Sequence, residues 1–149
     1  MIVREARSTD IPSLLDFQLK MALETENVQL EILPLTQGMQ RLFKDPSKGK
    51  YYVAEEAEEV VGCLMTTFEW SEWRCGTILW IQSVYVAIPW RGRGVFRSMY
   101  KHIQQLVDQE PDAKGIRLYV EKKNGAAQKV YSDLGMNGDH YTVFEWMKD

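Results

Sequence analysis

The chain has 149 residues, 45% of them hydrophobic and 26% charged, which suits one globular domain with a hydrophobic core. No apolar run reaches the length of a membrane span and no signal peptide is recognised, so we expect no membrane partner. The net charge of −3 disfavours a nucleic-acid partner, and two cysteines without metal-ligand spacing indicate a cytoplasmic protein that has neither disulfides nor a metal.

Strands and helices are expected to alternate, with no repeat or linker that would mark a domain boundary. Residues 2–6 alternate as a strand does, and residues 8–10 with Pro12 predict the start of a helix that ends near Glu26. The later elements expected are a helix at 35–43, strands at 50–55 and 60–68, a strand at 78–87, a helix at 91–109, a strand at 116–121, a helix at 125–134 ended by Gly135, and a strand at 141–147. This order predicts a single α/β or α+β domain, residues 1–149, around a mixed sheet.

The most informative stretch is residues 84–97, where a β-branched strand leads into a glycine–arginine loop and then a helix. Gly92 and Gly94 let the backbone approach a ligand closely, while Arg91 and Arg93 supply positive charge. Backbone N–H groups and a helix N-terminus can then converge on one phosphate group. The stretch therefore predicts a site for a phosphorylated cofactor.

The spacing excludes two common phosphate loops. Val95 and Phe96 follow Gly94 where a P-loop has Lys and Ser or Thr, and Arg97 stands where a dinucleotide fingerprint needs a third Gly or Ala. The loop instead resembles the Arg-x-x-Gly-x-Gly/Ala loop of the GNAT superfamily, the acetyl-CoA-dependent N-acetyltransferases. Phe96 stands where that family usually has Gly or Ala, so we expect its ring to turn towards the core and leave the backbone donors intact.

A second segment, residues 124–136, resembles the family pattern Asn-x-x-Ala-x-x-x-Tyr-x-x-x-Gly-Phe, with Met136 in place of Phe. The residues around Tyr85 are also similar to the diamine acetyltransferase branch. The resemblance implies the GNAT fold, with a mixed central sheet of about six to seven strands and about four helices.

The resemblance also implies how acetyl-CoA would be held as co-substrate. In the family, the loop matching residues 92–97 wraps the CoA pyrophosphate with backbone N–H groups. The strand end matching residues 84–86 pairs with the pantetheine arm, and one backbone N–H there points at the thioester oxygen. The implied cofactor-binding residues are Val84, Tyr85, Val86, Arg91, Gly92, Arg93, Gly94, Val95, Phe96, Arg97, Asn124, Ala127 and Tyr131.

Tyr131 matches the tyrosine that donates a proton to the departing sulfur in the family. A free thiol has a pKa of about 8.5 and a tyrosine about 10, so a phenol can protonate a nascent thiolate. The alternative is that Tyr131 only packs its helix against the sheet; its spacing from Asn124 and Gly135 favours the catalytic role.

The three cations Arg93, Arg97 and Lys101 recur every four residues and are expected on one helix face. A solvated face is the ordinary interpretation of such a series. Because the series begins in the glycine loop, contact with the phosphates of a cofactor is favoured here.

The general base is the least defined part of the predicted site. Gln82, which matches a Glu of the diamine acetyltransferases, and its neighbour Ser83 cannot accept a proton at neutral pH. Glu69 and Glu72 are catalytic candidates that would act through water, with two solvated loop carboxylates as an equal alternative. His140, just before the last expected strand, is a weaker candidate, because a lone histidine near a turn is more often a surface or capping residue.

Two tryptophans, Trp70 and Trp73, stand in a polar turn between carboxylates. They fit either a rim that attracts a cationic amine or the interface of a homodimer.

The function expected is transfer of an acetyl group from acetyl-CoA to a primary amine by direct attack, most simply a small-molecule amine. Carboxylates on segments expected near the acceptor suggest a cationic substrate; they are Glu24, Glu26, Glu31, Glu69 and Glu72. The alternatives are a protein lysine or N-terminal acetyltransferase, and an acyl-CoA sensor with little turnover.

Overall fold

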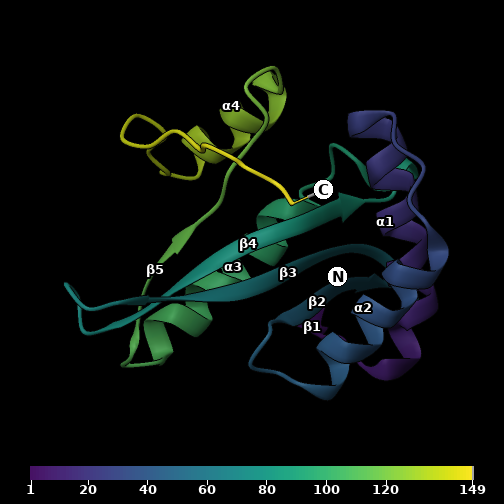
Figure 1. The fold of residues 1–149 in the computed structure, drawn as a ribbon, viewed down its shortest axis with the longest axis horizontal. Helices are drawn as coiled ribbons and strands as arrows, with labels where there is room; N and C mark the ends of the chain where they lie inside the picture. Colours follow the sequence, from purple (N-terminus) through teal and green to yellow (C-terminus); the bar gives the residue numbers. More distant parts are fainter. Residues whose placement is uncertain (149) are drawn as a thin grey trace. The chain divides into compact units, whose positions relative to one another are not determined.

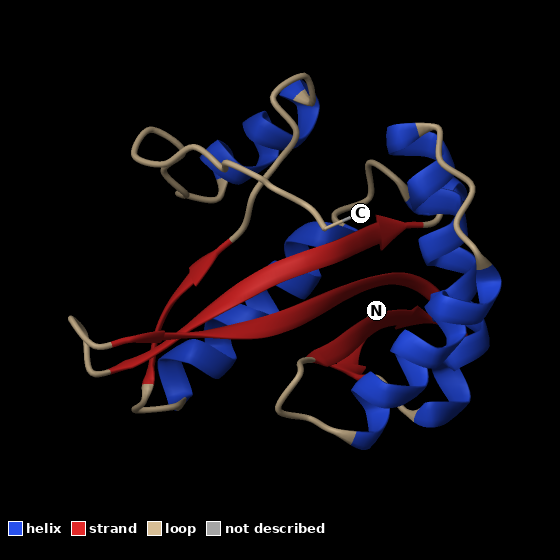
Figure 2. Cartoon of the chain, viewed as in Figure 1, coloured by secondary structure: helices blue, strands red, loops and turns tan. Residues whose placement is uncertain are grey.

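A computed structural model describes residues 1–148 and divides the chain into two compact units, Met1–Arg117 and Leu118–Asp149 (Figures 1 and 2). The elements of the first unit are β1 (Ile2–Glu5), the 3-10 turn η1 (Ser8–Asp10), α1 (Ile11–Glu26), α2 (Ile32–Lys44), β2 (Lys50–Glu56), β3 (Glu59–Ser71), β4 (Gly76–Val86), the 3-10 turn η2 (Ile88–Trp90), α3 (Val95–Gln109) and β5 (Ala113–Arg117). The second unit contains α4 (Gly125–Asp133). Within residues 1–148, no helix is long and apolar enough to cross a membrane.

The first unit is built on one mixed sheet with the strand order β1-β2-β3-β4-β5. Neighbouring strands from β1 to β4 run antiparallel, and β5 runs parallel to β4. The α+β class, the mixed sheet and the four α-helices predicted from the sequence are confirmed. The described residues contain five strands, however, so the expected count of six to seven was too high.

The difference in strand count comes from the C-terminal segment. Residues 141–147 were expected to close the chain as a strand, but they form none. Alternating apolar and polar side chains are typical of a strand with one buried face. A strand also needs a hydrogen-bonded neighbour, and the alternation in the sequence does not show whether one exists. The strand expected at 116–121 is also shifted, since β5 ends at Arg117.

The helices cover both faces of this sheet. α1 contacts β3 and β4, and their shared core is a cluster of Leu14, Phe17, Met39, Leu42, Tyr51, Val53, Cys63 and Tyr85. α3 packs on the opposite face, behind the sheet in Figure 1. Gly62 of β3 permits this close approach, because a Cβ atom there would lie 2.9 Å from Cγ1 of Val95 at the start of α3.

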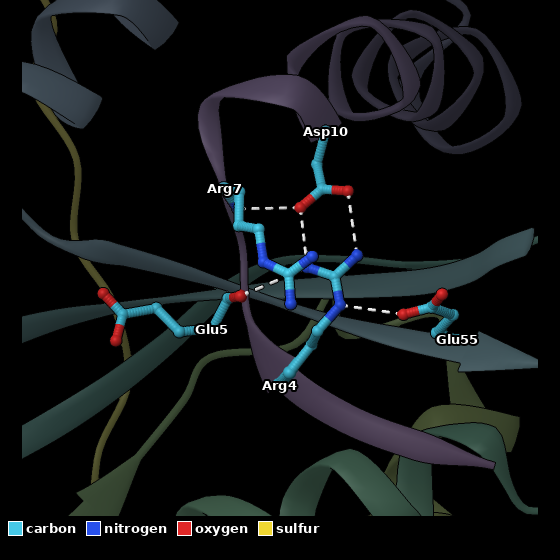
Figure 3. A network of polar contacts seen from close by, with 5 residues as sticks. All are labelled: Arg4, Glu5, Arg7, Asp10 and Glu55. Carbon is cyan, nitrogen blue, oxygen red and sulfur yellow. Dashed lines mark hydrogen bonds and ion pairs between the residues drawn. The ribbon is translucent and has the colours of Figure 1, made fainter. Parts of the chain in front are cut away.

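A buried carboxylate joins the first strand to the first helix (Figure 3). Asp10 accepts hydrogen bonds from Nη1 and Nη2 of Arg4 at 2.8 and 3.0 Å and from the backbone N–H of Arg7 at 2.7 Å. The Nε atom of Arg4 donates to Glu55 of β2 at 2.8 Å. The guanidinium therefore lies between two carboxylates, and these hydrogen bonds hold the pKa of Asp10 below its usual value.

Replacing Asp10 by asparagine is expected to lower the free energy of unfolding at pH 7 by about 2 kcal/mol, because Arg4 loses a charged acceptor. The carboxylate contributes fully above the ordinary aspartate pKa of about 4 and loses its contribution as the pH falls through the lower native value. Urea unfolding at pH 7 and pH 3 should show the difference from wild type shrinking in acid. The exposed Asp108 gives the control Asp108→Asn, and an equal loss at both pH values would contradict the account.

Candidate active site

The C-terminal half of β4 carries a β-bulge. Cys63 of β3 pairs with Tyr85, but Met65, two residues on, pairs with Gln82, so β4 has one extra residue in this interval. Ser83 absorbs the irregularity with φ of +55°, a left-handed conformation that is strained for a residue with a side chain. The bulge lies within the strand end that was predicted to contact the cofactor.

Two buried side chains support the bulge. The Nε2 atom of Gln18 on α1 lies 3.4 Å from the carbonyl oxygen of Ser83, and the Cys63 thiol lies 3.6 Å from the same oxygen. Burial raises the pKa of Cys63 to about 12, so the thiol keeps its proton and can donate. The sequence analysis missed Gln18; its signal was an amide on the otherwise apolar face of α1.

Beyond the bulge, one edge of β4 is open. β5 pairs with β4 only between Thr77 and Trp80, and within residues 1–148 no strand pairs with that edge from Ile81 onward. The backbone of Ala87 instead faces β3, since its N–H donates to Val61 at 2.9 Å. The alternation of backbone groups therefore directs those of Val84 and Val86 to the open edge. The Val86 carbonyl accepts from Nε of Arg91 at 2.8 Å, so an extended ligand could pair with Val84 and with the N–H of Val86.

The predicted phosphate loop lies between this strand end and α3. Gly92 and Gly94 have φ of +76° and +78°, and a Cβ atom on either would have no atom of residues 1–148 within 4 Å except those of its chain neighbours. Their left-handed backbone starts α3 at Val95 rather than at residue 91. Among residues 1–148 no side chain caps the first turn of α3, and its first backbone hydrogen bond runs from Ser98 to Gly94, so the earlier amides are free of this ladder.

The cations around the loop have different surroundings. The Arg93 guanidinium lies 5.1 Å above the ring of Trp90, within the distance of a cation–π contact. Because α3 begins at Val95, Arg93 belongs to the loop, and only Arg97 and Lys101 share the exposed helix face. The prediction of one helix face for all three cations was therefore wrong.

Phe96 follows the expectation from the sequence. Its ring is half-buried, and its centroid lies 6.1 Å from that of Tyr100, a buried residue of α3. The side chain therefore takes part in helix packing and leaves the backbone N–H groups of the first turn available.

Arg91 is held by protein groups. Its Nε atom donates to the carbonyl oxygen of Val86 at 2.8 Å, and Nη2 donates to Glu24 at 2.7 Å. The Tyr85 hydroxyl also donates to Glu24, at 3.1 Å. These hydrogen bonds, that from Arg91 first, lower the pKa of Glu24, so the carboxylate expected near a cationic acceptor is already paired.

The second unit presents the other predicted segment on α4. Asn124 caps the helix, since its Oδ1 atom accepts from the N–H of Ala127 at 3.1 Å. Tyr131 lies in the last two turns and is half-buried, and Gly135 ends the helix with φ of +89°. Burial raises the pKa of Tyr131, which keeps the phenol protonated at neutral pH, as a proton donor requires.

Glu69 and Glu72 lie at the opposite end of the β3–β4 hairpin from the bulge, the end at the left of Figure 1. Glu69 accepts from Nε1 of Trp80 at 2.7 Å and from Nη1 of Arg117 at 2.8 Å. These interactions, that of Trp80 first, lower the pKa of Glu69 and weaken it as a proton acceptor. Glu72 is exposed in the turn after β3.

The same turn carries the two tryptophans. Trp73 is 89% exposed and Trp70 is 62% exposed. This exposure is compatible with both uses considered from the sequence, an amine-attracting rim and a dimer interface.

The open strand edge, the bulge and the glycine loop together form a site whose shape and charge suit an extended, phosphate-bearing ligand along β4. Known proteins agree. The model of the acetyltransferase (GNAT) family matches residues 16–136. The chain belongs to the GNAT family of acetyltransferases: it is an acyltransferase, and its family uses acetyl-CoA.

Solved structures give the same result. A possible acetyltransferase from Clostridium difficile 630 is 39% identical, with a TM-score of 0.92 over 99% of this chain and 97% of that one. Two more distant structures share the fold alone. A transcriptional regulator from Bacillus halodurans C-125 is 20% identical, with a TM-score of 0.83 over 98% and 99% of the two chains. An aminoglycoside acetyltransferase from an uncultured soil metagenomic sample, solved with sisomicin, is 14% identical, with a TM-score of 0.78 over 99% and 95%. No curated protein matches the chain.

Proposed function

We propose that this protein transfers the acetyl group of acetyl-CoA to a primary amine of a small molecule, with residues 1–149 acting as one catalytic domain. The observation that carries the proposal is the glycine loop, whose left-handed Gly92 and Gly94 lead into the uncapped first turn of α3. This turn is joined to the strand whose edge is open by the 3-10 turn η2 and the glycine loop.

The residues present suit the charge and shape of acetyl-CoA, which supplies the acetyl group as a thioester. Backbone amides of residues 92–97 would bind the pyrophosphate at the positive end of the α3 dipole, with Arg93 and Arg97 adding charge. The open edge of Val84 and Val86 would pair with the pantetheine arm, and an amide at the bulge would polarise the thioester carbonyl.

The proton transfers divide between two groups. The amine must lose a proton as its nitrogen forms the bond to the acetyl carbon, and the sulfur must gain one as its bond to that carbon breaks. We assign the second transfer to Tyr131, whose raised pKa keeps its proton available, and assign Asn124 and Ala127 to the cofactor arm by the family pattern.

The prediction that Glu69 or Glu72 accepts the first proton stays a prediction, and the geometry weighs against it. Glu69 pairs with Ile78, six residues before Val84, which at 3.3 Å per residue places it roughly 20 Å from Val84. Its carboxylate is also held by Arg117. An acceptor amine that arrives neutral would need no strong base.

Transfer to lysine side chains or protein N-termini is the second candidate, and an acyl-CoA sensor the third. The similarity to diamine acetyltransferases, a homodimer and a cytoplasmic location stay predictions of the sequence. To separate the candidates, release of free CoA thiol should be followed with acetyl-CoA and either pooled small amines or lysine-containing peptides. Release with the amines supports the proposal. Release with peptides alone would favour the second candidate, and cofactor binding without release the third.

A further inference from the structure

A single carboxylate joins the end of α1 to the entrance of the glycine loop. Glu24, two residues before the last residue of α1, accepts from Arg91 at 2.7 Å and from the Tyr85 hydroxyl at 3.1 Å. Tyr85 is 5% exposed, and its ring centroid lies 5.0 Å from that of Phe17 in the core. The carboxylate is therefore aligned by a rigid aromatic side chain.

Arg91 is restrained on three sides. Besides its bond to Glu24, its Nε atom donates to the carbonyl of Val86 at 2.8 Å, and its guanidinium carbon lies 5.2 Å from the ring centre of Tyr85. These contacts fix the residue directly before Gly92 to the last residue of β4. The glycine part of the loop, from Gly92 to Gly94, thus begins from a fixed residue.

The ion pair with Glu24 also distinguishes Arg91 from Arg93 and Arg97. Its charge is matched by the Glu24 carboxylate, whereas within residues 1–148 neither Arg93 nor Arg97 forms an ion pair with a carboxylate. A guanidinium already bonded to a carboxylate and a carbonyl has fewer donors left for phosphate than a free one. Arg91 is thus better placed to support the loop than to bind the ligand.

We propose that Glu24 and Arg91 are positioning residues that hold the glycine loop in its ligand-binding shape. The proposal rests on acetyl-CoA binding at this loop. It assigns to Glu24 a role in cofactor affinity, although Glu24 lies on α1 and carries the same sign of charge as the cofactor. It also makes the geometry of the loop depend on the C-terminal end of α1.

The direction in which the affinity for acetyl-CoA changes when Glu24 is removed distinguishes this positioning role from a purely electrostatic effect. If Glu24 only opposed an anionic ligand, its removal would tighten binding of acetyl-CoA by reducing repulsion and freeing Arg91. If Glu24 holds the loop in place, its removal weakens binding, because the loop must then be ordered by the ligand. The two accounts predict opposite changes.

Calorimetric titration of acetyl-CoA, without acceptor, should be made with wild type, Glu24→Ala, Arg91→Gln and the double variant. We expect Glu24→Ala to weaken the affinity for acetyl-CoA about tenfold. The double variant should bind no more weakly than whichever single variant binds more weakly, because the two residues act as a unit. Glu24→Gln, which keeps the shape and one acceptor oxygen, should weaken it about threefold. With saturating acetyl-CoA and an accepted amine, the kcat of Glu24→Gln should equal that of wild type.

The control is Glu26→Gln, which removes the same charge two residues further along α1 and should change the affinity less than about twofold. Affinity of Glu24→Ala equal to or tighter than wild type, or additive losses in the double variant, would overturn the positioning role. If Glu24→Ala unfolds, the direction of change in Glu24→Gln decides. If wild type binds no acetyl-CoA, the proposed function itself fails.

Discussion

Valine at both Gly92 and Gly94 is expected to abolish measurable binding of acetyl-CoA while the protein stays folded. Both glycines have φ near +77°, where a residue with a Cβ atom is disfavoured by about 1–2 kcal/mol. A Cβ atom on either would lie in open space, with no atom of residues 1–148 beyond its chain neighbours within 4 Å, so the fold can accept the new side chains while they crowd the loop proposed to bind the pyrophosphate. Calorimetric titration of acetyl-CoA should give no heat of binding, and circular dichroism should remain that of wild type.

A matched control separates backbone strain from loss of the ligand site. Gly135 is also a left-handed glycine, with φ of +89° and open space at its Cβ position, but it lies at the end of α4, outside the loop. Gly135→Val should therefore carry a similar strain per site and leave acetyl-CoA binding measurable. Wild-type affinity in the double glycine variant would rule out the loop as the cofactor site.

Removal of the Tyr131 hydroxyl is expected to lower kcat about 100-fold and to leave the affinity for acetyl-CoA within about threefold of wild type. The phenylalanine keeps the ring and its packing on α4 but has no proton for the departing sulfur. Because burial raises the pKa of Tyr131, the wild-type rate should not fall on the alkaline side until the pH exceeds the ordinary tyrosine pKa of about 10. Steady-state rates of thiol release across pH would test both statements.

Tyr119→Phe is the comparison for this variant, since Tyr119 lies in the same unit but outside the predicted motif and is exposed. Its kcat should match that of wild type. If Tyr131→Phe also turns over at the wild-type rate, Tyr131 has only a packing role and another group protonates the sulfur.

Local patterns explain what could be predicted from the sequence. Glycines act through the backbone of neighbouring residues, and the helix expected at 125–134 is observed at Gly125–Asp133, just before the left-handed Gly135. The hairpin β2–β3 and the helix α1 follow from alternation and periodicity in the same way. The predicted cofactor residues lie on β4, on the glycine loop with the start of α3, and on α4, which follow from local patterns of the same kind.

Contacts between residues far apart in the sequence explain the features that could not be predicted from it. The bulge at Ser83 becomes visible only from the register of β4 against β3, and its support by Gln18 joins residues 65 positions apart. The pairing of Glu24 with Arg91 spans 67 positions, so charge patterning suggested an acceptor site instead. Alternation at 141–147 likewise gave a strand without indicating a partner for it.

Titration of the wild-type protein with acetyl-CoA in a calorimeter tests the central claim most directly. We expect one saturable site per chain, with affinity that falls as salt is raised because phosphates meet Arg93 and Arg97. Subsequent addition of an accepted amine should release CoA. Absence of binding would contradict the account from the glycine loop onward.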